Sequence, residues 1–189
     1  MPMRTFFPVL LLLILFACSP QNIDEGKILT VSGEISPEEI GLTLIHEHIL
    51  VDFIGADSTG YHRWDKDSVV QKVLPFLAEI KARGVKTLVE CTPSYLGKDP
   101  VLLQKLTEAT GIQFITNTGY YGAVEGKYLP SHAYSESAEE LSKRWIAEFQ
   151  NGIEDTGIKP GFIKISVNSG PSLSEMDEKL VKAAALTYK

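Results

Sequence analysis

The chain has 189 residues, of which 44% are hydrophobic and 22% are charged, and its formal net charge at pH 7 is -6. This length suits one globular domain rather than two, and the charged fraction is normal for a folded protein. The acidic balance and the lack of a long basic run argue against a nucleic-acid partner, which would need a basic patch.

The first 17 residues have the layout of a secretory signal peptide. Arg4 precedes the apolar run FFPVLLLLILFA, which is too short to cross a hydrocarbon core of about 30 Å as a helix. The run ends in LFAC, which resembles the lipobox of bacterial lipoproteins and places the lipidated cysteine at Cys18. We therefore predict a signal peptide over 1–17 and a lipidated cysteine with a polar tether over 18–27. Acyl chains rather than a spanning helix would then hold the protein on the periplasmic or extracellular side of the bacterial envelope. An ordinary signal peptide with a chance cysteine is the alternative.

From residue 28 onward, the pattern predicts strands that alternate with helices. A short strand over 28–31 and one turn over 36–39, with a capping-box pattern and proline at its first position, come first. A second strand over 42–45 then runs into His46-Glu47-His48. The remaining expected helices cover 67–83, 99–111, 137–152 and 174 onward, and the remaining expected strands cover 85–91, 112–118 and 161–167.

This alternation predicts right-handed βαβ units and a parallel sheet covered by helices. Long loops follow the strands and short ones precede them, as in a (β/α)₈ TIM barrel, whose active site lies at the carboxyl ends of the strands. Four units make only half of such a barrel, which typically needs about 250 residues. We therefore predict an α/β fold in which residues 28–189 form the N-terminal half of a TIM barrel and the chain stops within a helical pattern. An open flavodoxin-like sheet is the alternative.

His46 and His48 are candidate metal ligands. Residues two apart on a strand face the same side, about 6.6 Å apart, so their imidazoles can converge on one ion. A regular strand puts Leu44 on the same face, with Ile45 and Glu47 toward the helices. Two hydrogen-bonded histidines without a metal are the alternative.

Lys164 is the second candidate, because it shares the expected interior face with Phe162 and Ser166 while Ile163 and Ile165 alternate with it. An unpaired buried ammonium is costly, and a lysine that snorkels outward or pairs with a carboxylate is the structural alternative. A lysine amine normally titrates near 10.4, but burial near cationic metals depresses such a pKa. A neutral amine adds carbon dioxide and becomes an anionic carbamate that can bridge two metals.

Several segments resemble the phosphotriesterase family of the amidohydrolase superfamily. GLTLIHEHILVDF resembles its first-strand motif, and NGIEDTGIKPGFIK resembles the stretch that leads to its carboxylated lysine; TVSGEISPEEIG, GVKTLVECT, LGKD and ITNTGYYG fall in family order. The likeness covers 30–189. It implies that His46 and His48 bind the more buried of two divalent metal ions, with zinc favoured, and that Lys164 carries a bridging carbamate derived from CO2.

The resemblance also implies the chemistry, which is hydrolysis of an ester-type bond by a hydroxide held between two metals. In the family, histidines from strands five and six and an aspartate from strand eight complete the metal centre, and none of these can be located in this sequence. His62 and His132 are expected to be surface histidines rather than substitutes. Without the later strands, we expect the isolated chain to have little or no turnover.

Tyr120 and Tyr121 follow a strand end and are expected to bind the substrate. Tyr121 matches the position where phosphotriesterases proper carry tryptophan and lactonase-like relatives carry tyrosine, so it is a candidate catalytic-site residue and favours a small lactone or carboxylic ester over a phosphotriester. A wall aromatic without a chemical role is the alternative. We expect a homodimer for the full-length protein. A non-catalytic surface lipoprotein that keeps the fold for binding is the competing function.

Overall fold

The computed structural model describes residues 26–188. The predicted signal peptide, Cys18 and nearly all of the tether lie outside the described residues. Within 26–188, no helix is long and apolar enough to cross a membrane.

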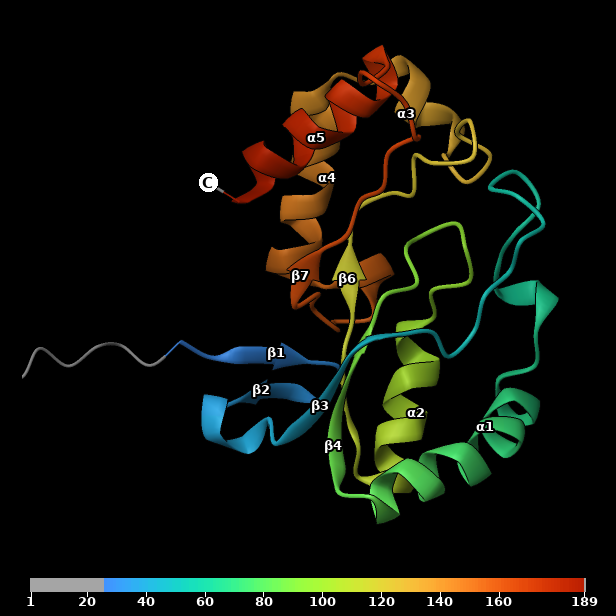
Figure 1. Ribbon diagram of the computed structural model, residues 1–189, viewed down its shortest axis with the longest axis vertical. Helices are drawn as coiled ribbons and strands as arrows, with labels where there is room; N and C mark the ends of the chain where they lie inside the picture. Colours follow the sequence, from blue (N-terminus) through green and yellow to red (C-terminus); the bar gives the residue numbers. More distant parts are fainter. Residues whose placement is uncertain (1–25, 189) are drawn as a thin grey trace, which may run out of the picture.

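The described chain begins with a hairpin that projects from the rest of the molecule (Figure 1). β1 (Ile28–Thr30) pairs antiparallel with β2 (Gly33–Ile35), and a 3₁₀ turn, η1 (Pro37–Glu39), follows. The Glu39 carboxylate accepts a hydrogen bond of 2.7 Å from the backbone N–H of Ser36, which confirms the predicted capped turn. β2 was not predicted, because a three-residue strand that is mostly exposed carries no periodic hydrophobic signal.

Beyond the hairpin, the predicted alternation of strands and helices is confirmed. The elements are β3 (Leu42–Glu47), η2 (Tyr61–Arg63), α1 (Lys66–Ala82), β4 (Val85–Glu90), α2 (Pro100–Thr110), β5 (Gln113–Ile115), β6 (Asn117–Thr118), α3 (Ser131–Ser135), α4 (Ala138–Asn151), η3 (Ile153–Asp155), β7 (Phe162–Ile163) and α5 (Glu175–Tyr188). The five-residue helix α3 was missed, because it is too short to show helical periodicity.

Side-chain caps fix the helix starts. Asp65 caps α1 by accepting a hydrogen bond of 2.8 Å from the N–H of Ser68, so this helix begins earlier than predicted. Asp99 caps α2 in the same way at 3.0 Å, and Gly111 ends that helix in the left-handed conformation at φ 72°. A side chain with a Cβ would resist this conformation, which explains the glycine there.

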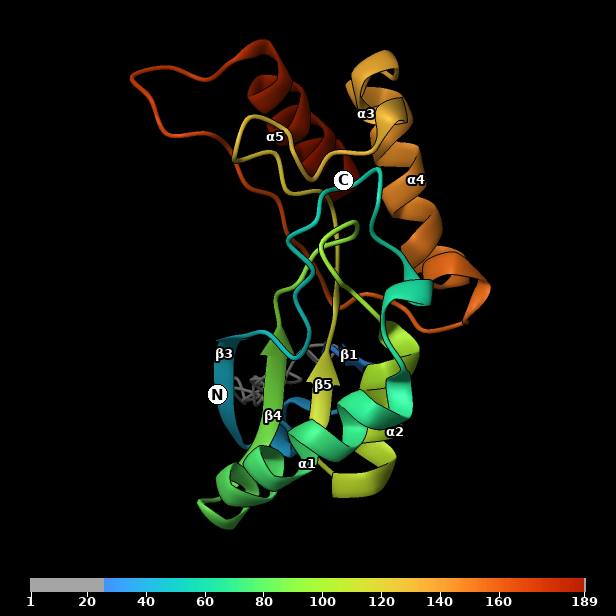
Figure 2. The ribbon, with the colours of Figure 1, turned by 90° about the vertical axis from the view of Figure 1, so that its right-hand side faces the viewer.

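The strands follow one another in chain order. β3, β4 and β5 form a parallel sheet in that order, and β6 pairs parallel with β7. The single strand predicted over 112–118 is interrupted at Thr116, which separates β5 from β6. A flavodoxin-like sheet would place its first strand between the second and third, so the observed order favours the barrel. The strands form an open, partial barrel, with α1 and α2 on one face (Figure 2).

A bulge in β3 changes which side chains face the helices. Leu44 pairs with Leu88 and Glu47 pairs with Glu90, so β3 uses three residues where β4 uses two. The expectation that Leu44 shares a face with the histidines is therefore wrong, because Leu44 packs with the core beneath the helices. Ile45 is also not directed at the helices, since its side chain is 77% exposed. The extra residue re-aims the strand just before its histidines.

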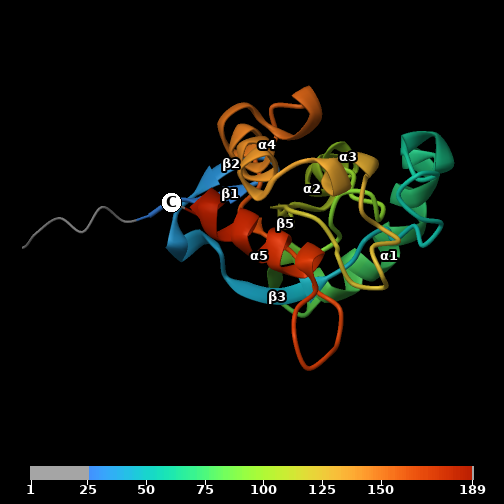
Figure 3. The ribbon, with the colours of Figure 1, turned by 90° about the horizontal axis from the view of Figure 1, so that it is seen from above.

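The apolar residues form two separate cores. The first core lies among β4, β5, α1 and α2, and the second lies among α3, α4, α5 and the segment after β6. The buried members of the first core are Val31, Leu77, Val85, Leu88, Leu102, Leu103, Leu106, Ile112, Phe114 and Ile158. Those of the second are Tyr120, Leu129, Ala133, Ala138, Leu141, Trp145, Leu180 and Ala183. Seen from above, α1, α2 and α4 follow one another around the strands (Figure 3).

Lys98 connects the part of the chain around the first core with β6 and α4. This buried side chain leaves the β4–α2 loop, donates a hydrogen bond of 2.9 Å to the carbonyl of Asn117 and lies 3.7 Å from the Glu148 carboxylate of α4. Burial holds the pKa of Lys98 below its ordinary value, while Glu148 opposes this effect. A buried cation with so few partners is stable only if the strand and helix stay in place, so Lys98 ties their positions together.

Candidate functional site

The two predicted histidines lie side by side at the carboxyl end of β3. His46 is in the strand and His48 directly follows it, with ring centroids 5.4 Å apart and ring planes tilted by 59°. Two imidazoles on one tetrahedral zinc, with Zn–N bonds of about 2.1 Å and about 1.2 Å from nitrogen to ring centre, have centroids about 5 Å apart. The observed pair therefore fits one shared ion.

His48 is held by a partner from the next strand end. Its Nδ1 lies 2.9 Å from Thr92 Oγ1, and the Thr92 hydroxyl in turn contacts the buried carboxylate of Glu90. Burial, followed by the charges of His46 and Lys164, lowers the pKa of His48 below its ordinary value. A lowered pKa favours the neutral imidazole, which is the form that binds metals.

Glu90 is a nearly solvent-free carboxylate at the end of β4, with 2% of its surface exposed. Burial raises its pKa to about 7, and hydrogen bonds from Thr92 and from the backbone N–H of Ile49 oppose that rise. From the sequence, Glu90 is expected to be a structural residue or one that supports the site from beside it, and Thr92 carries no signal. Glu90 and Thr92 are connected to His48 through a contact between the ends of β3 and β4, and a local sequence pattern cannot predict such a contact.

Lys164 directly follows β7, at the same carboxyl edge. Its backbone N–H donates a hydrogen bond of 2.7 Å to the carbonyl of Thr118, which continues the pairing of β6 with β7. Its charge lowers the pKa of His48 and acts against the burial that raises the pKa of Cys91. The Lys164 side chain is half-buried and follows the carboxyl end of β7, as His48 follows the carboxyl end of β3.

The two tyrosines differ in their surroundings. Tyr120 is 5% exposed, contacts His132 Nε2 at 2.9 Å and packs edge-on against Trp145 in the second core. This packing suits a core residue and leaves little surface for a substrate. Tyr121 is half-buried and packs against Tyr128, with its ring centroid 5.8 Å away. Only the second position is suited to a substrate contact.

The other histidines do not join the site. His62 is exposed, as expected, whereas His132 is half-buried by its contact with Tyr120 and is not a surface residue. Within residues 26–188, no three or more His, Cys, Asp and Glu side chains gather closely enough to hold a metal. The described residues thus supply two imidazoles and one amine, which suit part of a metal centre and not all of it.

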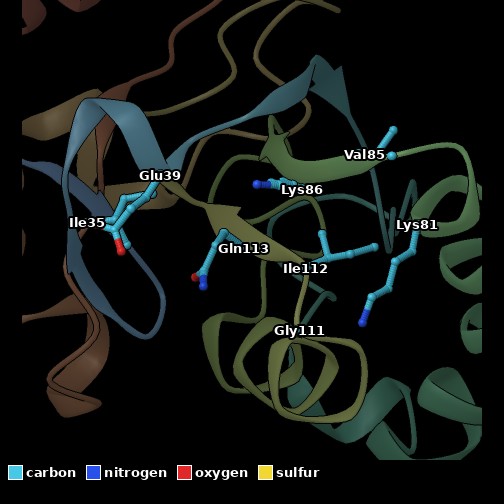
Figure 4. A pocket seen from close by; sticks show the side chains of 9 residues that line it. Ile35, Glu39, Lys81, Val85, Lys86, Gly111, Ile112 and Gln113 are labelled. Atoms are coloured by element: carbon cyan, nitrogen blue, oxygen red, sulfur yellow. The ribbon is translucent and has the colours of Figure 1, made fainter.

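A hollow of about 520 Å³ lies at the opposite end of the strands (Figure 4). It is lined by the amino ends of β4 and β5, and Lys81, Lys86 and Gln113 are among its side chains. In barrel enzymes, this end serves stability and the carboxyl end serves catalysis. The hollow is therefore not part of the candidate site.

Comparison with known proteins agrees with this geometry. The sequence model of the "Phosphotriesterase family" matches residues 26–189. The chain is similar to an "Aryldialkylphosphatase" of Saccharolobus solfataricus, at 32% identity over 82% of this chain and 48% of the relative. It is also similar to an "N-acetyltaurine hydrolase" of Homo sapiens, at 28% identity over 85% of this chain and 52% of the relative.

Solved structures show the same relationship. A mutant of the organophosphorus hydrolase from Deinococcus radiodurans superposes with a TM-score of 0.74 at 27% identity, over 85% of this chain and 49% of that one. The chain thus spans about half the length of the relatives it matches. The matched half is the partial TIM barrel predicted above, not a flavodoxin-like sheet. By its sequence and its fold, this chain belongs to the phosphotriesterase family.

Proposed function

We propose that the whole protein is a metal-dependent hydrolase of a small ester, with lactones and carboxylic esters preferred over phosphotriesters. The observation that supports this most is the position of His46, His48 and Lys164, each at the carboxyl end of a parallel strand. Catalytic groups gather at this edge in barrel enzymes. The relatives are hydrolases by name, which agrees with the proposal.

In this proposal, His46 and His48 bind one divalent ion through neutral imidazoles. Lys164, once carboxylated by CO2, would supply an anionic oxygen ligand to the metal centre. When bound, a pair of zinc ions supplies Lewis acidity and a water of lowered pKa. Tyr121 forms a wall of the substrate site through its half-buried ring. The remaining ligands would come from the part of the whole protein that corresponds to the unmatched half of the relatives.

The choice of substrate rests on Tyr121. Relatives named for phosphotriester and N-acyl amide hydrolysis widen the range to be tested. A lactone, a carboxylic ester, a phosphotriester and an N-acyl amide should therefore be compared on the complete gene product. Fastest turnover of the lactone or the ester is the expected result. Fastest turnover of the amide or the phosphotriester would remove the role given to Tyr121.

The metal site is tested by measuring bound zinc in purified variants of the complete protein. His46→Ala and Lys164→Ala should lose bound metal and activity, whereas His62→Ala and Lys159→Ala, at exposed positions, should keep both. A carbamate resonance from ¹³C-labelled bicarbonate should be present in the wild type and both control variants and absent in Lys164→Ala. Full metal content with activity in both site variants would refute the proposed centre. Bound metal without any hydrolysis of the four substrates would favour the non-catalytic lipoprotein instead.

We also propose that Cys18 anchors the protein to the cell envelope. The argument rests on the LFAC sequence alone. An inhibitor of lipoprotein signal peptidase should leave the preprotein uncleaved and Cys18→Ala should abolish lipidation. Normal processing in the presence of the inhibitor would refute the anchor.

A further inference from the structure

The environment of Thr92 connects the candidate metal site to a buried carboxylate. Thr92 lies just beyond β4 and is fully buried. Its hydroxyl contacts both His48 Nδ1, at 2.9 Å, and Glu90 Oε1. A threonine hydroxyl has one proton to donate, so it donates to one of these partners and accepts from the other.

The Glu90 carboxylate determines which of its two partners receives the hydrogen bond that the Thr92 hydroxyl donates. Its Oε1 faces the backbone N–H of Ile49 at 3.2 Å as well as the Thr92 hydroxyl, and its Oε2 faces the backbone N–H of Thr92 at 3.2 Å. Two backbone N–H groups thus converge on Glu90, and its carboxylate can only accept hydrogen bonds when it is ionised. When Glu90 is ionised, above its pKa of about 7, the Thr92 hydroxyl donates to Glu90, and the Thr92 oxygen accepts a hydrogen bond from His48 Nδ1.

The rest of the strand end holds this arrangement in place. The side-chain amide of Asn117 donates to the carbonyls of Glu90 and Thr92, at 3.0 Å each. The backbone N–H of Cys91 donates to the carbonyl of Glu47 at 2.8 Å, directly beside His48. These bonds fix Thr92 relative to both strands without using its hydroxyl.

We propose that Thr92 is a positioning residue that fixes His48 with its proton on Nδ1 and so leaves Nε2 free to bind the metal. The inference rests on the proposed metal site. A ring held in the other tautomer would point its proton at the ion, and a ring without a partner would rotate. Hydrogen bonds of this kind to metal-binding histidines typically change metal affinity by about 10- to 100-fold.

Thr92→Val removes the hydroxyl with little change in volume, and Thr92→Ser restores it. Thr116→Val is the matched control, because Thr116 is 1% exposed and its hydroxyl has no hydrogen-bond partner within the described structure. Zinc affinity of the complete protein is measured by competition with a chelator. Thr92→Val should bind zinc about 10- to 100-fold more weakly, while the serine variant and the control should stay close to the wild type.

The ring tautomer gives a second readout that needs no metal. In metal-free wild-type protein, the ¹⁵N shifts of the His48 ring should show the proton on Nδ1, and Thr92→Val should shift the population toward Nε2–H. A wild-type ring protonated on Nε2, or unchanged zinc affinity and tautomer in Thr92→Val, would overturn the proposal. If His46→Ala binds zinc like the wild type, the metal site itself is wrong, and the metal-free spectra still decide the role of Thr92.

Discussion

Replacing Gly119 by alanine tests how closely the end of β6 approaches the backbone of Lys164 at the end of β7. Gly119 has a φ of 107°, and a Cβ built there would lie 2.2 Å from the carbonyl oxygen of Lys164 and 2.9 Å from its carbonyl carbon. An ordinary carbon–oxygen contact is about 3.3 Å or longer. The atoms in the way are backbone, so rotation of a side chain cannot relieve the clash. The backbone at Lys164 would have to move by about 1 Å.

Two costs add in this variant. A non-glycine residue in this region of φ costs about 1–3 kcal/mol, and forcing atoms into a packed site costs about 1–3 kcal/mol more. Gly33→Ala is the matched control, because Gly33 has a φ of 118° and, among residues 26–188 other than its chain neighbours, no atom lies within 4 Å of the place that an alanine methyl would take. Gly33→Ala should therefore show only the cost of placing a non-glycine residue at a positive φ.

The assay is equilibrium unfolding in denaturant together with bound zinc in the complete protein. Gly119→Ala should be less stable than Gly33→Ala by about 1–3 kcal/mol. It should also lose zinc, because the substitution displaces Lys164, a ligand in the proposed metal centre. A misplacement of about 1 Å in a catalytic site costs about 100-fold in rate. Equal stability of the two variants, with normal zinc content in both, would refute the close approach of these strands.

Two further predictions concern the two cores. Leu106→Ala, at a fully buried position of the first core, should lower the free energy of unfolding by about 2–5 kcal/mol. The exposed control Glu108→Ala on the same helix should change it by about 0.5 kcal/mol or less. Both values are measured by unfolding in denaturant, and equal effects would contradict the packing assigned to Leu106. Asp177 accepts hydrogen bonds from Ser174 and the backbone of Asn168, and these hold its pKa below the ordinary value. Since the native pKa is the lower one, the stabilisation is present above the unfolded value of about 3.9 and is lost as the pH falls through the native pKa. The stability advantage of the wild type over Asp177→Asn should therefore shrink in acid, and a constant difference from pH 6 to pH 3 would contradict this linkage.

The sequence predicted the fold well where signals are local. Helix caps such as Asp99 and the alternating apolar runs marked the units correctly. The strand facing was wrong at Leu44, because the period-two rule assumes a regular strand and a bulge depends on the neighbouring strand. The break at Thr116 is of the same kind, since it reflects the pairing of β5 and β6 with different partners.

The candidate site was only partly predictable, for a related reason. His46, His48 and Lys164 lie at strand ends, so residue type and position were enough to name them as candidates. Tyr120 and Tyr121 are adjacent and chemically identical, so only the packing against Trp145 distinguishes them. Thr92 carries no chemical signature of its own and gains its role from what it touches.

The division into two cores bears on how the candidate site is held together. The strand before His46 packs on the first core through Leu44, whereas Ile163 and Ile165, on either side of Lys164, pack on the second. A cation bound by all three side chains would therefore add a link between two cores that strand pairing, Lys98 and loop contacts such as Tyr61–Glu154 already connect. Since a ligand that binds only the joined state stabilises that state, zinc loading should raise the cooperativity of unfolding as well as the midpoint.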